Sequence, residues 1–406
     1  MSDTGRRISR RCMLAGLAAL GASSYGSKAS AAPKAVKISI GRQPWGGSNS
    51  FETEYMIRNR LVEKNAGLLG LNLELEWRDY PTAIPMVEAF VSGSLDFGLW
   101  GNTPIVRGIA QSQPWSVLSL AEGRLRFVLA TRPDSGIHNV QDLKGKVVGA
   151  TIGGDSFNAL SQMVKMELGT SIADAGIRVV NTPTQAQAAA MPTGMAAAVV
   201  IYPAFLKAEQ ELGIIGIVNS YGTTESGYQG SAGSGPGIAL PSARKSPFYP
   251  EGFYIHRTFW MARNQVLEAQ PDATVAFLMA QQQAVAALSK MKASDAAALS
   301  ASYWGLSPEL GARIVEDELV LKRRWIWPTE GDARALVALS GFMAEAKMVP
   351  GPLTMAQVKS AFEKSAVLNK TAWQRSGEQP PVATFTDPEA QDIRGIPVWD
   401  LANWKA

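Results

Sequence analysis

The sequence is poor in the residues that most often bind metals or act as nucleophiles. Its 406 residues include one cysteine, Cys12, and two histidines, His138 and His256. Cys12 lies in the first thirty residues, and without that segment the chain has no thiol, which excludes disulfides, thiol catalysis and iron–sulfur ligation. The histidines are far apart and neither has metal-ligand spacing. His138 is expected in solvent and His256 in the core. We therefore expect no metal, no cofactor and no catalytic residue.

Apolar runs long enough to span a bilayer are also missing. The run from Cys12 to Ala22 is shorter than the roughly 20 residues that a membrane-spanning helix needs. Paired arginines (Arg10, Arg11) precede this run, and the small-residue site Ala29-Ser30-Ala31 follows it, which favours a twin-arginine signal peptide over residues 1–31 and export to the periplasm. Cys12 comes before the run, so lipidation is not expected. A cytoplasmic basic amphipathic helix is the alternative, but the run has no polar face.

The excess of positive charge belongs to this first segment. The whole chain has 39 basic and 35 acidic residues, a formal net charge of +4. Residues 1–31 hold five of the basic residues and one of the acidic ones, so 34 of each remain in the mature chain. A neutral mature chain gives no indication of a nucleic-acid partner.

Motifs of hydrolases and dinucleotide enzymes are missing as well. Ser231 and Ser234 lack the flanking glycines of a nucleophile elbow. The run "GSGPG" is not followed by the spacing of a dinucleotide site. The carboxylates of residues 316–318 lie on a charged helix, where a solvated face is expected. Twin-arginine export favours proteins that fold before crossing, often around a cofactor, which keeps an exported enzyme as an alternative.

The first half of the chain alternates short β-rich runs with helical stretches, the pattern of an α/β fold with a parallel sheet. Residues 50–67 are predicted as one helix, with Ser50 as N-cap and Gly67 as its end, and Thr103 is predicted as the N-cap of another. Helices are expected from Pro271 to about Leu368. Strands are predicted at 36–41, 71–77, 95–101, 115–122, 126–132, 177–183, 214–220 and 253–264, with others after Lys146 and before Tyr202. The Gly/Ser-rich stretch 221–252 has no clear periodicity, and the tail 371–406 is expected to wrap an earlier surface.

Four motifs in order carry a family resemblance: "GSLDFG" from Gly93, "GNTP" from Gly101, "SGIHNVQDLKG" from Ser135, and Tyr202-Pro203. Together they resemble the solute-binding proteins of ABC importers, in the branch that handles nitrate, alkanesulfonates, taurine and thiamine-precursor pyrimidines. The resemblance implies a two-lobed periplasmic-binding-protein fold (type II), with two strands that cross between the lobes and closure by a hinge. Lobe 1 would comprise 34–126 plus 253–406, and lobe 2 127–252. It also implies a small-molecule ligand, a permease and an ATPase as partners, and a monomer.

Ligands of open α/β sheets bind beyond the carboxyl ends of the strands, which selects four loops. In the first, Arg42 could pair with an anion, although a solvated arginine on a turn is the alternative. In the second, a helix start presents N–H groups, and a plain N-cap at Thr103 would serve stability alone. The candidate residues of these two loops are Arg42, Gln43, Trp45, Ser48, Asn49, Trp100, Asn102 and Thr103.

The third loop, "GGDSFN", offers Gly154 for close backbone approach, Asp155, and Ser156 as a cap and donor. Asp155 would repel an anion unless it turns to solvent or the ligand carries an amine. The fourth loop offers the Tyr202 hydroxyl, for which a buried structural role is equally compatible. Trp260 could close the cleft, although a core position is the more usual role.

These observations predict a periplasmic substrate-binding component of an ABC importer that captures a small organic anion such as a sulfonate. Trp45, Trp100 and Trp260 favour a ligand with an apolar or aromatic body over bare nitrate. Asp155 keeps an amine-bearing or pyrimidine ligand open. The alternatives are an exported enzyme on the same fold and a ligand-binding sensor protein.

Overall fold

The computed structural model describes residues 35–45, 49–122, 127–191, 194–220, 236–238, 256–317, 325–377 and 395–405. These lie within one compact unit that spans Ala35–Ala406. The predicted signal segment, Ser48 and most of the stretch 221–252 lie outside the described residues, so their predictions stay untested.

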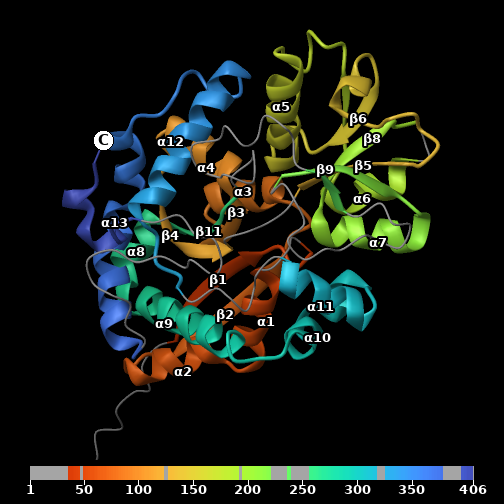
Figure 1. Cartoon of the computed structure of the whole chain (residues 1–406). Coiled ribbons are helices and arrows are strands. Elements are labelled where there is room, and N and C mark those ends of the chain that lie inside the picture. Colours follow the sequence, from red (N-terminus) through yellow and green to blue (C-terminus); the bar gives the residue numbers. More distant parts are fainter. Residues whose placement is uncertain are drawn as a thin grey trace, which may run out of the picture. The chain divides into compact units, whose positions relative to one another are not determined.

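A five-stranded sheet is built mainly from the N-terminal third of the chain (Figure 1). Its strands, in spatial order, are β2 (Leu73–Asp79), β1 (Val36–Arg42), β3 (Phe97–Gly101), β11 (Thr258–Arg263) and β4 (Trp115–Glu122). β1 is parallel to β2 and β3, whereas β11 is antiparallel to β3 and β4. The carboxyl ends of β1, β2 and β3 therefore meet at one edge of this first sheet.

A six-stranded second sheet follows. Its strands, in spatial order, are β10 (Pro236–Ile238), β9 (Ile215–Asn219), β5 (Phe127–Thr131), β8 (Ala197–Ile201), β6 (Val147–Ala150) and β7 (Arg178–Asn181). β6 is parallel to β7 and β8, and β5 is antiparallel to β8 and β9. Every residue of β5 and β8 is buried, as expected for strands covered on both faces. The carboxyl end of β8 leads directly into a helix, whereas β6 reaches its helix through the loop 151–154.

The chain passes from the first sheet to the second between β4 and β5, and returns between β10 and β11. Crossing strands were predicted at 126–132 and 253–264. The described strands there, β5 and β11, each belong to one sheet. The predicted α/β fold with two sheets is confirmed, and the lobe boundaries stay a prediction.

Helices surround both sheets, and most of the predicted ones are present (Figure 1). The single helix predicted for 50–67 is wrong: Arg60 adopts a left-handed conformation (φ 50°) that separates two helices. The first of them begins before Ser50, and the second continues past Gly67, so neither residue has its predicted capping role. The helices are α1 (Asn49–Arg58), α2 (Leu61–Leu68), α3 (Ala83–Val91), α4 (Asn102–Ala110), α5 (Asp155–Leu168), α6 (Thr184–Ala190), α7 (Tyr202–Leu212), α8 (Asn264–Ala269), α9 (Pro271–Leu288), α10 (Ala293–Trp304), α11 (Pro308–Asp317), α12 (Glu330–Glu345) and α13 (Met355–Arg375).

The C-terminal segment 395–405 packs on α12 and α13. Pro397 forms a β-bridge with Thr329, just before α12. Trp399 stacks on Trp373 of α13 at 4.8 Å, with 17° between the ring planes. The backbone N–H of Lys405 donates to a Glu330 carboxylate oxygen at 2.9 Å. The expectation that the tail wraps an earlier surface is confirmed for these residues. Within the described ranges, no helix combines the length and apolar character needed to cross a membrane.

Candidate functional site

Two of the four predicted loops contact each other at the starts of α4 and α5. α4 follows β3 of the first sheet, and α5 follows β6 of the second. The backbone N–H of Thr103 donates to Oδ1 of Asp155 at 2.9 Å, and Nδ2 of Asn158 donates to Oγ1 of Thr103 at 3.1 Å. The Asp155 carboxylate thus lies at the positive ends of both helix dipoles, where a negative charge is stabilised. A group of the chain itself occupies the anion position at the start of α4.

Gly101 and His256 complete this junction. Nε2 of His256 lies 3.5 Å from Oδ2 of Asp155, and the histidine is 3% exposed. A Cβ at Gly101 would overlap both the carboxylate and the imidazole, so the glycine is required for their close approach. Asn102 accepts a hydrogen bond from the backbone N–H of Arg257 at 3.0 Å. The prediction that His256 is buried is confirmed, and His138 is exposed as predicted.

The predicted capping roles at these helix starts are wrong. Gly101 is the N-cap of α4, so Thr103 lies inside the first turn. Gly154 is the N-cap of α5, and Oγ of Ser156 accepts from the backbone N–H of Thr151 at 2.9 Å. In both cases the helix begins earlier than the Ser/Thr preference suggests, because the glycine adopts the extended conformation needed at the cap.

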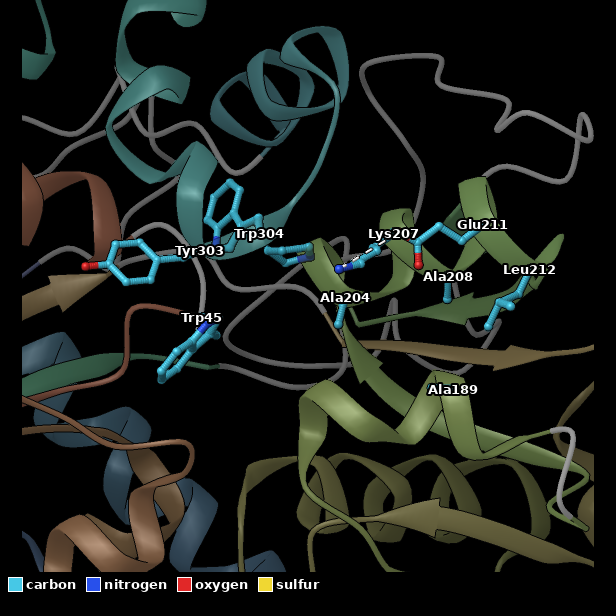
Figure 2. A pocket seen from close by; sticks show the side chains of 10 residues that line it. Trp45, Ala189, Ala204, Lys207, Ala208, Glu211, Leu212, Tyr303 and Trp304 are labelled. Atoms are coloured by element: carbon cyan, nitrogen blue, oxygen red, sulfur yellow. Dashed lines mark ion pairs between the residues drawn. The ribbon is translucent and has the colours of Figure 1, made fainter.

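The other two loops line a pocket of about 420 Å³ between Trp45, α7 and the end of α10 (Figure 2). Trp45 and Tyr303 meet edge to face, with ring centroids 5.9 Å apart and 90° between their planes. Lys207 and Glu211 form an ion pair at 3.9 Å, and both are about half exposed. The lining residues are Trp45, Ala189, Pro203, Ala204, Lys207, Ala208, Glu211, Leu212, Tyr303 and Trp304. The lining is therefore mostly apolar and aromatic, with one cation and one anion.

Tyr303, Trp304 and Lys207 were not predicted as site residues. Tyr303 and Trp304 end α10 directly before Gly305, which has the left-handed conformation of a helix C-cap (φ 61°). An aromatic pair before such a glycine was the available signal. Nothing in the local sequence indicates that this helix end lies near Trp45, more than 250 residues earlier.

Arg42 is held by carboxylates instead of pointing freely into the pocket. Its Nε donates to Oδ1 of Asp79 at 2.6 Å, another nitrogen pairs with Glu54, and Nη2 donates to the Tyr303 hydroxyl at 2.7 Å. Burial lowers the pKa of Arg42, but the bonds to Asp79 and Glu54 outweigh it and raise the pKa overall. Burial raises the pKa of Tyr303 above its ordinary value. Figure 2 shows the Tyr303 hydroxyl directed away from Lys207. Arg42 therefore fixes the position of the Tyr303 ring.

Two of the candidate tryptophans are fully buried in the first sheet. Trp100 on β3 packs against Phe90 and Trp115, at centroid distances of 5.0 and 5.4 Å. Trp260 on β11 packs against Phe277 at 4.9 Å, and its Nε1 donates to Glu52 at 3.3 Å. These positions agree with the core role that was the alternative for Trp260.

The remaining candidates have structural partners. The Tyr202 hydroxyl donates to Oδ2 of Asp317 at 2.5 Å, and both side chains are buried. The solvated face predicted for residues 316–318 is therefore wrong at Asp317. Nε2 of Gln43 donates to the Leu99 carbonyl at 2.8 Å, which ties the first loop to β3. Asn49 begins α1, but its side chain lies outside the described part. Among the described residues, no group of three or more His, Cys, Asp or Glu side chains is placed to hold a metal ion.

Two α/β sheets whose carboxyl edges supply a shared set of loops define the class of periplasmic-binding-protein folds. The model of the NMT1/THI5 like family matches residues 70–291, more than half of the chain. The chain belongs to this family, which confirms the predicted resemblance. Among proteins with curated functions, none matches the sequence.

Solved structures show the same fold. The periplasmic nitrate-binding protein NrtA from Synechocystis PCC 6803 has a TM-score of 0.60 and 11% identity, over 92% of this chain and 100% of its own. The alkanesulfonate-binding protein SsuA from Xanthomonas axonopodis pv. citri, bound to MOPS, has a TM-score of 0.58 and 17% identity, over 81% and 99%. The desulfurization enzyme DSZB has a TM-score of 0.54 and 11% identity, over 81% and 99%. At these identities the likeness concerns the fold alone.

Proposed function

We propose that this protein is the periplasmic substrate-binding component of an ABC importer and captures a small organic anion, sulfonate-like in character. One observation carries the proposal: loops at the carboxyl edges of the two sheets meet in two places. Thr103 meets Asp155 at one place, and Trp45 faces α7 at the other. Membership of the NMT1/THI5 like family supports this function.

Closure of the two lobes would couple binding to transport. Trp45 belongs to the loop after β1, and Lys207 to the helix after β8. A ligand held between them would favour the closed form only by the extra contacts that it makes in that form. A permease and its ATPase would recognise the closed form. Export by the twin-arginine route and a monomeric state complete the proposal.

The pocket favours an organic anion over a bare inorganic one. Its volume of about 420 Å³ and its aromatic lining suit a ligand with an apolar body. Arg42 is already paired with two carboxylates, so Lys207 is the cation that would receive the acidic group. Contacts from Thr103, Gly154 and Asp155 to the ligand remain part of the proposal.

Binding would be tested by calorimetric titration of the mature chain after any carried ligand is removed by unfolding and refolding. The panel comprises taurine, MOPS, alkyl and aryl sulfonates, nitrate, aromatic carboxylates and a thiamine-precursor pyrimidine. Saturable binding of an organic sulfonate that is recovered unchanged is the expected result. Lys207→Ala should weaken it about tenfold, as loss of a charged contact worth about 1.4 kcal/mol.

The matched control is Lys364→Ala, because Lys364 is 46% exposed and paired with Glu268, as Lys207 is 45% exposed and paired with Glu211. The control should bind like the wild type. Absence of binding for every organic anion of the panel would contradict the proposed ligand class. The fold shared with DSZB makes an exported enzyme the second candidate, and recovery of a converted compound would establish it.

A further inference from the structure

The charged and aromatic groups of the pocket together specify more than an organic anion. We infer that the ligand is a zwitterion, in which an acidic group faces Lys207 and an alkylated ammonium group rests against the aromatic side chains led by Trp45. This inference rests on the proposed function, since it concerns the ligand of the same pocket.

Charge balance is the first argument. Among the described lining residues, the charged side chains are Lys207 and Glu211, which pair with each other at 3.9 Å. A purely anionic ligand that takes Lys207 would leave the Glu211 carboxylate beside a second negative charge. A ligand that carries its own positive charge removes this repulsion, because the net charge of the lining and the net charge of the ligand are then both zero.

The aromatic lining is the second argument. Trp45, Tyr303 and Trp304 line one pocket, and the first two rings stand at 90° to each other. Aromatic faces attract alkylated ammonium groups through the ring quadrupole, and tryptophan does so best. Arg42 already lies 5.5 Å from the centroid of the Tyr303 ring. Trp45 is therefore the side chain expected to provide the main face for the ammonium group.

The occupied helix start is the third argument. The Asp155 carboxylate accepts the Thr103 N–H at 2.9 Å, where the acidic group of a ligand would otherwise bind. This contact directs the acidic group toward Lys207.

A matched pair of probes tests the inference. Trimethylammoniopropanesulfonate is a permanent zwitterion, and its carbon isostere has a quaternary carbon in place of the nitrogen. The two have the same shape and the same sulfonate, so calorimetric titration of both isolates the positive charge. We expect the zwitterion to bind about 5- to 30-fold more tightly, the range that cation–π attraction provides.

Variants locate the preference in the pocket. Trp45→Leu keeps an apolar side chain but removes the aromatic face, so it should abolish the preference, and Trp45→Phe should retain part of it. Trp399→Leu is the control, since Trp399 stacks on Trp373 of α13 and does not line the pocket. If Trp45→Leu does not fold, titration of the two probes on the wild-type protein still decides whether the zwitterion is preferred.

Equal binding of both probes, or tighter binding of the isostere, would overturn the inference and leave the organic-anion function standing. Binding of other sulfonates with neither probe bound would also overturn it. Failure of every sulfonate would remove the proposed ligand class itself. The outcomes for the two proposals are thus distinct.

Discussion

Replacement of Gly101 by alanine should weaken the contact between α4 and α5 without straining the backbone. Gly101 has φ −81° and ψ −174°, which alanine adopts freely. The added Cβ would overlap the Asp155 carboxylate and the His256 imidazole. The Asp155 carboxylate ends a side chain that can rotate, so its part of the clash is relieved by movement of the carboxylate away from the Thr103 N–H.

The cost of this movement can be estimated from the bond that it breaks. Thr103 donates to an ionised carboxylate at 2.9 Å, and a hydrogen bond to a charged group contributes about 1.5–3 kcal/mol. We expect the free energy of unfolding to fall by about 2 kcal/mol. For a chain of this size that corresponds to a decrease in Tm of about 3 °C.

Differential scanning calorimetry and amide hydrogen exchange at Thr103 would measure the effect. Gly341→Ala is the control, because Gly341 lies inside α12 with open space around it. This substitution should raise the free energy of unfolding by about 0.5–1 kcal/mol. In an Asp155→Ala background the further Gly101→Ala change should cost less, because only the overlap with His256 remains. An unchanged Tm with full protection of the Thr103 amide would refute the reasoning.

Three further outcomes are expected from the same structure. Arg42→Met should lower the free energy of unfolding by about 3 kcal/mol in chemical denaturation, because it leaves Glu54, whose side chain is 9% exposed, without its closest cation. Tyr303 should remain mostly protonated at pH 10, because burial raises its pKa. The stability that its neutral form contributes is complete below the ordinary tyrosine pKa and is lost as pH rises through the raised pKa of Tyr303. An ultraviolet titration of the wild type and of Tyr303→Phe checks this. Trp399→Ala should cost about 2 kcal/mol through loss of stacking on Trp373, and ligand affinity should stay at the wild-type value in calorimetric titration.

Local pattern was enough to predict most of the strands and helices. β1, β3 and β4 lie where β-rich runs between turn residues predicted them, and helices occupy most of the described chain from Pro271 to Leu368, as predicted. The break at Arg60 was missed because arginine is a good helix former, and its left-handed conformation has no signal in the local sequence. The loops of the site could be predicted, since they follow from strand direction alone.

The partners of the site residues could not be predicted, because they come from distant parts of the sequence. Arg42 has the position of a ligand-binding cation, but Asp79 on the neighbouring strand and Tyr303 on α10 hold it. Trp100 lies in a strand whose residues are all buried, so its place at the end of a strand did not bring it to the pocket. Asp155 was expected to repel a ligand anion, and it instead accepts the Thr103 N–H at the start of α4.

The position of β11 between β3 and β4 has a consequence for synthesis. The first sheet receives this strand only after residue 263, although its neighbours are complete by residue 122. At a synthesis rate of about 5–20 residues per second, the facing edges of β3 and β4 wait about 7 to 28 seconds for their partner. Unpaired strand edges are sites of aggregation, so chaperones that cover them should raise the yield of this protein. A fragment that stops before β11 should aggregate instead of folding into a lobe of its own.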